Sequence, residues 1–108
     1  MAEHEVVSMA EIERRHRGHW FSSGAKQFFA CRLASFGYKI TDEQGTRVYF
    51  VSSERFLDPL KRDGYSGGRL YSVRVLDWET GDIDTVGEFQ QYTTGKAADR
   101  AARKLAGY

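Results

Sequence analysis

At 108 residues, with 41% hydrophobic and 14% aromatic residues, the chain can bury one core and is expected to form a single domain over residues 1–108. The 16 Lys and Arg residues against 15 Asp and Glu residues give a net charge of +1, which excludes a strongly basic nucleic-acid-binding protein and a strongly acidic DNA mimic but leaves local basic patches open. A single cysteine and the lack of a long apolar run exclude a disulfide framework and a membrane span and favour a cytoplasmic location.

The first element is expected to be a short helix behind a frayed end, residues 1–7. Ser8, with Glu11 three residues on, has the pattern of a capping box, so a helix is predicted to run to about Arg17. The basic cluster at residues 14–17 would then lie at the negative end of the helix dipole. This placement favours a structural role for the cluster over a phosphate contact.

A second helix is expected from a cap at Ser22–Ser23 to about Ser35. Its apolar side chains recur on one stripe, made by Ala25, Phe29, Leu33 and Phe36. Nothing polar converges on that stripe, so we interpret it as core packing rather than as a cofactor site.

The first of two predicted β-hairpins pairs Tyr38–Thr41 with Arg47–Val51. The second of these strands is apolar on both faces, which predicts a central position in the sheet. Residues 57–68 follow as a long, polar, glycine-rich loop, which we interpret either as a partner-binding segment or as a tolerated insertion.

The second predicted hairpin pairs Arg69–Val75 with Ile83–Phe89 across a turn in which Gly81 takes a positive φ. The alternation in its first strand predicts one buried face and one exposed face, with Arg74 on the exposed one. A last helix is predicted from about Gly95 to Ala106. It would be capped by Thr93 or Thr94, with small alanines packed on the sheet.

The predicted fold class is therefore α+β, with elements in the order α-α-β-β-β-β-α. Four antiparallel strands in two hairpins would form one sheet, and the helices would cover one of its faces.

No catalytic, cofactor or metal site is expected. His16 and His19, even with Cys31, lack a fourth zinc ligand and a recognisable spacing. The glycines at 64–68 lack the Gly-Lys-Ser/Thr ending of a phosphate loop. The carboxylates fall mostly at turns and on alternating strand positions, as solvated groups do. These patterns favour a non-enzymatic protein that needs no cofactor.

From Trp20 onward the chain resembles a family of small uncharacterised proteins from bacteria and their phages. The resemblance is carried by Trp20-Phe21-Ser22, Phe28-Phe29 with Arg32, Phe50 to Glu54, Tyr71 to Arg74, and Asp84 to Gln90 with Tyr92. It implies no established activity, but membership of a phage family implies an accessory or counter-defence protein.

The C-terminal third has two further resemblances. Its last helix, from Thr94 through Ala102 to Leu105, is similar to that of a double-stranded-RNA-binding domain, although that family has a Lys-Lys pair where this chain has Gly95-Lys96. The order of strand, turn, strand and helix is similar to the arm-type DNA-binding domain of phage integrases. Both resemblances imply contact with nucleic acid.

Two functional hypotheses follow from these patterns. The leading one is a phage or mobile-element accessory protein that binds a host protein, as anti-CRISPR proteins do, and so inhibits or modulates machinery that handles nucleic acid. Its expected partner-binding residues are Arg62, Tyr65, Arg69, Arg74 and Trp78. Trp78 could instead fold back on the sheet as core. The alternative is direct DNA or RNA binding through the hairpins and the last helix, with Lys96, Arg100, Arg103 and Lys104 as the contacts.

Overall fold

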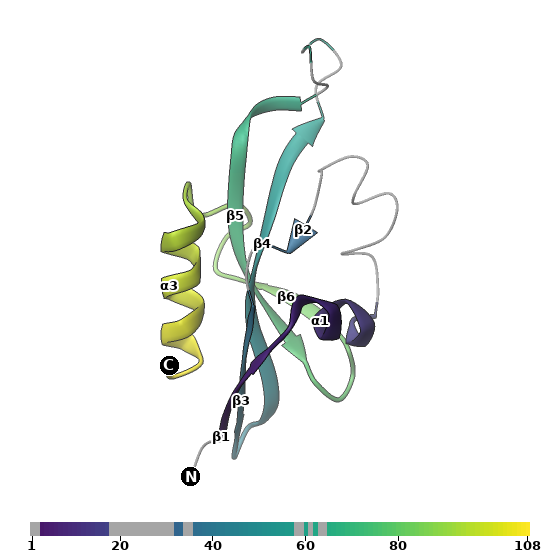
Figure 1. Ribbon diagram of the computed structural model, residues 1–108, viewed down its shortest axis with the longest axis vertical. Helices are drawn as coiled ribbons and strands as arrows, with labels where there is room; N and C mark the ends of the chain where they lie inside the picture. Colours follow the sequence, from purple (N-terminus) through teal and green to yellow (C-terminus); the bar gives the residue numbers. More distant parts are fainter. Residues whose placement is uncertain (1–2, 18–31, 34–35, 58–59, 61, 63–64) are drawn as a thin grey trace.

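One antiparallel sheet forms the middle of the molecule, and two helices lie against its faces (Figure 1). The computed structural model describes residues 3–17, 32–33, 36–57, 60, 62 and 65–108. In chain order the elements are β1 (Glu3–Val7), α1 (Met9–Arg15), β2 (Arg32–Leu33), β3 (Gly37–Asp42), β4 (Gly45–Leu57), β5 (Tyr65–Asp77), β6 (Ile83–Val86) and α3 (Gly95–Leu105).

The sheet has the strand order β1-β3-β4-β5-β6, with the two-residue β2 paired to β4 beyond the end of β3. This arrangement confirms the α+β class, the antiparallel sheet, both hairpins and the central place of β4. The prediction of four strands is wrong, because β1 and β2 add to the two hairpins. Register places Tyr38 opposite Tyr49 and Val51 opposite Val73, so apolar side chains meet across neighbouring strands.

Strand β1 corrects the prediction that residues 1–7 are frayed, because residues 3–7 pair with Gly37–Thr41 of β3. An edge strand gains its stability from the backbone ladder and from a few buried side chains, here Val7 at 5% exposure. The polar residues that made this end look frayed are compatible with an edge, where one strand side faces solvent.

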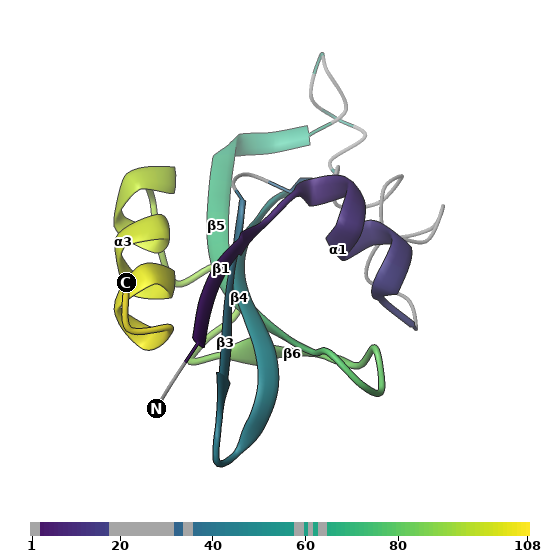
Figure 2. The same cartoon turned by 60° about the horizontal axis from the view of Figure 1, so that its bottom comes forward.

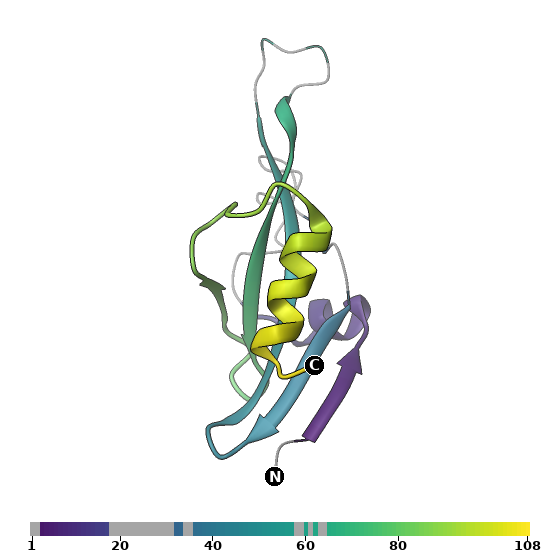
Figure 3. The same ribbon diagram turned by 90° about the vertical axis from the view of Figure 1, so that its left-hand side faces the viewer.

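Strands β4 and β5 each have 13 residues and project past the rest of the sheet as a two-stranded arm (Figure 3). Leu57 still pairs with Tyr65, so the predicted loop over residues 57–68 is too long at both ends. The ladder changes register between Glu54 and Phe56, where a bulge places three residues of β5 opposite one residue of β4. Tyr65 and Ser66, which the sequence places in the predicted loop, pair with Leu57 and Phe56 of β4.

Two separate hydrophobic clusters lie on opposite faces of the sheet. On one face, Ile12 of α1 packs with Val48 and Phe50 of β4 and with Leu76 of β5. On the other, the alanines of α3 pack with Val51 and other residues of the sheet. Figures 1 and 2 show α1 and α3 on either side of the strands. The prediction of helices on one face is therefore wrong, because the apolar residues of β4 alternate and each face needs its own cover.

Helix α1 begins as predicted, with the Ser8 hydroxyl accepting a hydrogen bond from the Glu11 N–H at 3.3 Å. It ends at Arg15, earlier than expected. The Arg17 N–H donates to the Gly81 carbonyl at 2.6 Å. Gly81 has a φ of +80°, and a Cβ there would lie 2.6 Å from the Arg15 carbonyl oxygen, so both the turn and the approach of α1 require glycine.

The predicted second helix lies mostly outside the described residues. At its expected end, Arg32 and Leu33 form β2 instead of helix, and the side chain of Phe36 is 56% exposed rather than buried in the core. Leu33 does pack against the cluster that contains Ile12. No helix in the described part of the chain is long and apolar enough to cross a membrane.

Helix α3 confirms the last predicted element. The Thr94 hydroxyl caps it by accepting from the Ala97 N–H at 3.2 Å. Ala98, Ala102 and Ala106 are fully buried, so the helix backbone lies close to β4 and β5. Leu105 is 44% exposed and is not part of this core, because its position falls at the border of the buried stripe.

Candidate functional site

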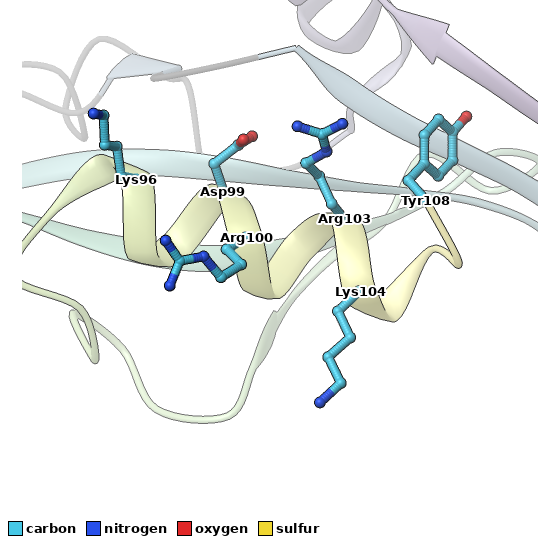
Figure 4. Close-up of a pocket in the computed structure, with 6 residues that line it drawn as sticks. All are labelled: Lys96, Asp99, Arg100, Arg103, Lys104 and Tyr108. Carbon is cyan, nitrogen blue, oxygen red and sulfur yellow. The ribbon is translucent and has the colours of Figure 1, made fainter.

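The exposed half of α3 carries four cations, Lys96, Arg100, Arg103 and Lys104, which we call the α3 cationic face. Three of them follow one another at intervals of four residues and therefore stack along the helix, about 6 Å apart in rise. All four are exposed, since the alanines take the opposite half of the helix. Figure 4 shows their side chains fanning out from the ribbon. The cations line an open depression of about 490 Å³ together with Asp99 and Tyr108.

Asp99 is the one acidic residue of α3, and it is directed to the sheet. The Tyr38 hydroxyl donates a hydrogen bond to its Oδ1 at 2.5 Å. Burial and this hydrogen bond raise the pKa of Tyr38 to about 12, so the hydroxyl stays protonated and remains a donor at neutral pH. Asp99 thus joins the helix to β3 at the border of the cationic face.

Arg103 and Tyr108 continue the contact between α3 and the sheet. The Arg103 guanidinium lies over the Tyr38 ring, 5.7 Å from its centroid. The Tyr108 hydroxyl donates to the Lys39 carbonyl at 2.9 Å. Burial raises the pKa of Tyr108 as well, which keeps this donor protonated. The C-terminal end of the cationic face is therefore held by aromatic and backbone contacts.

Several cations elsewhere in the described parts of the molecule have an anionic partner there, whereas the cations of α3 have none. Arg14 and Arg15 pair with Glu11, and Arg47 makes two hydrogen bonds to Asp42 that lower the pKa of that carboxyl group. Across the described ranges, no ion pair involves a cation of α3. The helix sequence carries four cations and one acid, so its local charge of +3 faces solvent.

Arg74, predicted to bind a partner, is instead 1% exposed. Its guanidinium donates to Glu54, itself 2% exposed, at 2.9 Å and to the Ser52 hydroxyl at 2.9 Å. Ser72 also donates to Glu54, at 3.4 Å. The prediction of an exposed strand face is wrong here, because an ion pair between neighbouring strands allows polar side chains to be buried.

Trp78 is half-buried and packs against the cluster that contains Ile12, which supports the alternative that it folds back on the sheet. The Arg15 guanidinium and the Lys39 ammonium lie 3.7 and 4.1 Å from the centroid of its ring. The side chain is therefore not fully exposed in the turn, as the prediction of an anchor there assumes. Cations already occupy positions over the ring.

Of the remaining predicted partner-binding residues, Arg69 lies on the opposite face of the sheet from Arg74 and Trp78. Arg69 is half-buried and donates to the Ser53 hydroxyl at 3.0 Å. Arg62 is exposed, and the side chain of Tyr65 lies outside the described parts. Arg74 and Trp78 lie on the α1 face of the sheet. Ser53, the hydrogen-bond partner of Arg69, lies on the α3 face, because successive residues of a strand point to opposite faces. The structure brings together the four residues of the alternative hypothesis, on α3.

The site also includes residues that the sequence did not indicate. Tyr38 and Asp99 are 61 positions apart, and no local pattern predicts their hydrogen bond. Tyr108 follows a helix end and gives no periodic signal. Over the residues with described positions, no group of three or more His, Cys, Asp or Glu side chains could hold a metal ion. His19 and Cys31, which the sequence analysis weighed as zinc ligands, lie outside those residues.

Comparison with known proteins gives one match. The model of a family of unknown function, DUF7447, matches residues 5–103. This confirms the resemblance to an uncharacterised family. No curated protein and no solved structure matches the chain.

Proposed function

We propose that this chain, which belongs to the DUF7447 family, binds nucleic acid through the α3 cationic face. The observation that carries the proposal is the placement of four exposed cations on one eleven-residue helix, in no ion pair with a described residue. Exposed Lys and Arg side chains that lack an internal counter-charge are suited to phosphate oxygens.

The helix fixes the spacing of these cations. Lys96, Arg100 and Lys104 span eight residues, or about 12 Å of rise. Arg103 lies beside this row and is oriented by its contact with Tyr38. Because α3 is anchored to the sheet through buried alanines, the row is rigid and a phosphate backbone can lie along it with little ordering of the protein.

The near-zero net charge of the whole chain does not oppose this proposal. Charges on exposed groups are screened beyond about 8 Å at physiological ionic strength, so a ligand on α3 responds mainly to the local charge of +3. The ion pairs described elsewhere join Arg14, Arg15, Lys39, Arg47 and Arg74 to the carboxylates of Glu11, Glu5, Asp42 and Glu54. The surplus positive charge of α3 is thus available to a polyanion.

The experiment is a fluorescence-anisotropy titration of labelled DNA and RNA oligonucleotides at low salt. The test variant is Arg100→Gln with Lys104→Gln, which removes two cations from α3. Two exposed charge contacts of about 0.5–1 kcal/mol each predict roughly 5- to 30-fold weaker binding. The matched control is Arg14→Gln with Arg17→Gln, which lowers the net charge equally at α1 and just after its end, with α1 on the opposite face of the sheet.

A loss of affinity of roughly 5- to 30-fold in the α3 variant, with little change in the control, supports the proposal. An equal loss in both variants would show that the attraction is general and not located on α3. A wild-type protein that binds no oligonucleotide but binds polyglutamate would identify an acidic protein surface as the ligand instead. That result would return the function to the hypothesis of a host-protein partner.

A further inference from the structure

We propose that Tyr108 is a base-stacking platform at the end of the α3 cationic face, and that the ligand is a single-stranded nucleic acid. This inference rests on the proposed function and names the class of nucleic acid. Single-strand-binding proteins combine cations that follow the backbone with aromatic rings on which bases stack. Here one ring and four cations line the same depression.

The ring of Tyr108 is exposed but fixed in place. Its side chain lies at the C-terminal end of the helix, beyond Arg103 (Figure 4), and the residue is 38% exposed. The ring lies 5.1 Å from the His4 ring at 84° and 5.1 Å from the Tyr38 ring at 59°. With the hydroxyl bonded to the Lys39 carbonyl, three contacts restrain one side chain. Because the Tyr108 side chain is already restrained, stacking of a base on its ring costs little additional side-chain entropy.

A second open depression, of about 420 Å³, is lined by His4, Glu5, Lys39 and Thr41. His4 contacts the Tyr108 ring, and Lys39 accepts the hydrogen bond of Tyr108 through its backbone carbonyl. Tyr108 therefore borders the depression along α3 and is held there by β1 and β3. A strand whose phosphates follow α3 would bring a base to this ring as it leaves the helix.

Stacking on a protein ring requires a base face that is not already covered. In a duplex each internal base is stacked between its neighbours, so a duplex can use the cations of α3 but not the ring. The arrangement of cations and ring thus predicts a preference for unpaired strands. It predicts no preference among base types, because every base has a π-face.

The test compares three ligands that share a phosphate backbone: a thymidine homopolymer of about 12 nucleotides, an abasic strand of equal length, and a hairpin duplex. Wild type is measured beside Tyr108→Ala and Tyr108→Phe. We expect Tyr108→Ala to weaken binding of the homopolymer by about 5- to 150-fold and to leave the affinity for the abasic strand unchanged. Tyr108→Phe keeps the ring and its packing and should bind the homopolymer within about twofold of wild type.

Two results would overturn the inference while leaving the proposed function intact. One is that Tyr108→Ala weakens binding of the homopolymer and of the abasic strand equally, which would show that the ring supports the structure and does not stack on a base. The other is wild-type binding of the duplex as tightly as the homopolymer. If wild type binds none of the three ligands, the proposed function itself fails. Circular dichroism of each variant identifies a loss of binding that is caused by unfolding.

Discussion

The α3 cationic face makes a quantitative prediction about salt. Each phosphate contact to a single strand lowers the slope of log affinity against log salt by about 0.7. Four exposed cations therefore predict a slope of about −2.8, and binding that weakens about 50-fold when salt rises from about 50 to about 200 mM. With Arg100→Gln and Lys104→Gln, two contacts remain, and the same step predicts a slope of about −1.4 and about sevenfold weaker binding.

The assay is an anisotropy titration of one labelled single strand at five or so salt concentrations, with both proteins at equal pH. The control variant Arg14→Gln with Arg17→Gln should keep the wild-type slope. The reasoning fails if the α3 variant binds more weakly but with an unchanged slope, because its loss of affinity would then come from something other than phosphate contacts. A wild-type slope near zero would exclude a phosphate interface altogether.

Other predictions concern the fold that supports this face. Replacing Glu54 by Gln takes the carboxylate from the buried Arg74 guanidinium and should lower the free energy of unfolding by about 3–5 kcal/mol in urea; a loss below about 1 kcal/mol would contradict the buried pair. Ala102→Leu should cost about 1–3 kcal/mol because α3 lies close on the sheet, whereas Leu105→Ala should cost less than about 1 kcal/mol; the reverse order would show that the helix is rotated. The stabilising contribution of protonated Tyr38 should be complete below about pH 10, the pKa of an unfolded tyrosine, and be lost as the pH approaches about 12. The difference in unfolding free energy between wild type and Tyr38→Phe should therefore shrink over that range, and a constant difference would contradict it.

Local patterns in the sequence predicted the parts of the fold that local interactions form. The caps at Ser8 and Thr94 and the turn at Gly81 each depend on residues a few positions apart. The central strand was predicted because Val48 and Val51 make both of its faces apolar. The four cations of α3 were likewise predicted from helical spacing, and the structure places them on its exposed side.

Two of the errors involve partners that are distant in sequence. Arg74 was read as exposed because its alternation is that of a solvent-facing residue, and its partner Glu54 is 20 positions away. Strand β1 has few apolar residues and depends on the backbone of β3 for pairing. Asp99 lies among the cations of α3 in the sequence, and Tyr38, which directs it toward the sheet, is 61 positions away. Only the tertiary structure brings these groups together.

The central claim, that α3 is the nucleic-acid interface, is tested most directly by an NMR titration. Amide resonances of the ¹⁵N-labelled wild-type protein are followed as an unlabelled single strand is added at low salt. The account predicts shifts concentrated between Lys96 and Lys104 and at Tyr108, with the amides of α1 on the opposite face unchanged. Shifts that cluster on α1 or β6 and leave α3 unchanged would contradict it.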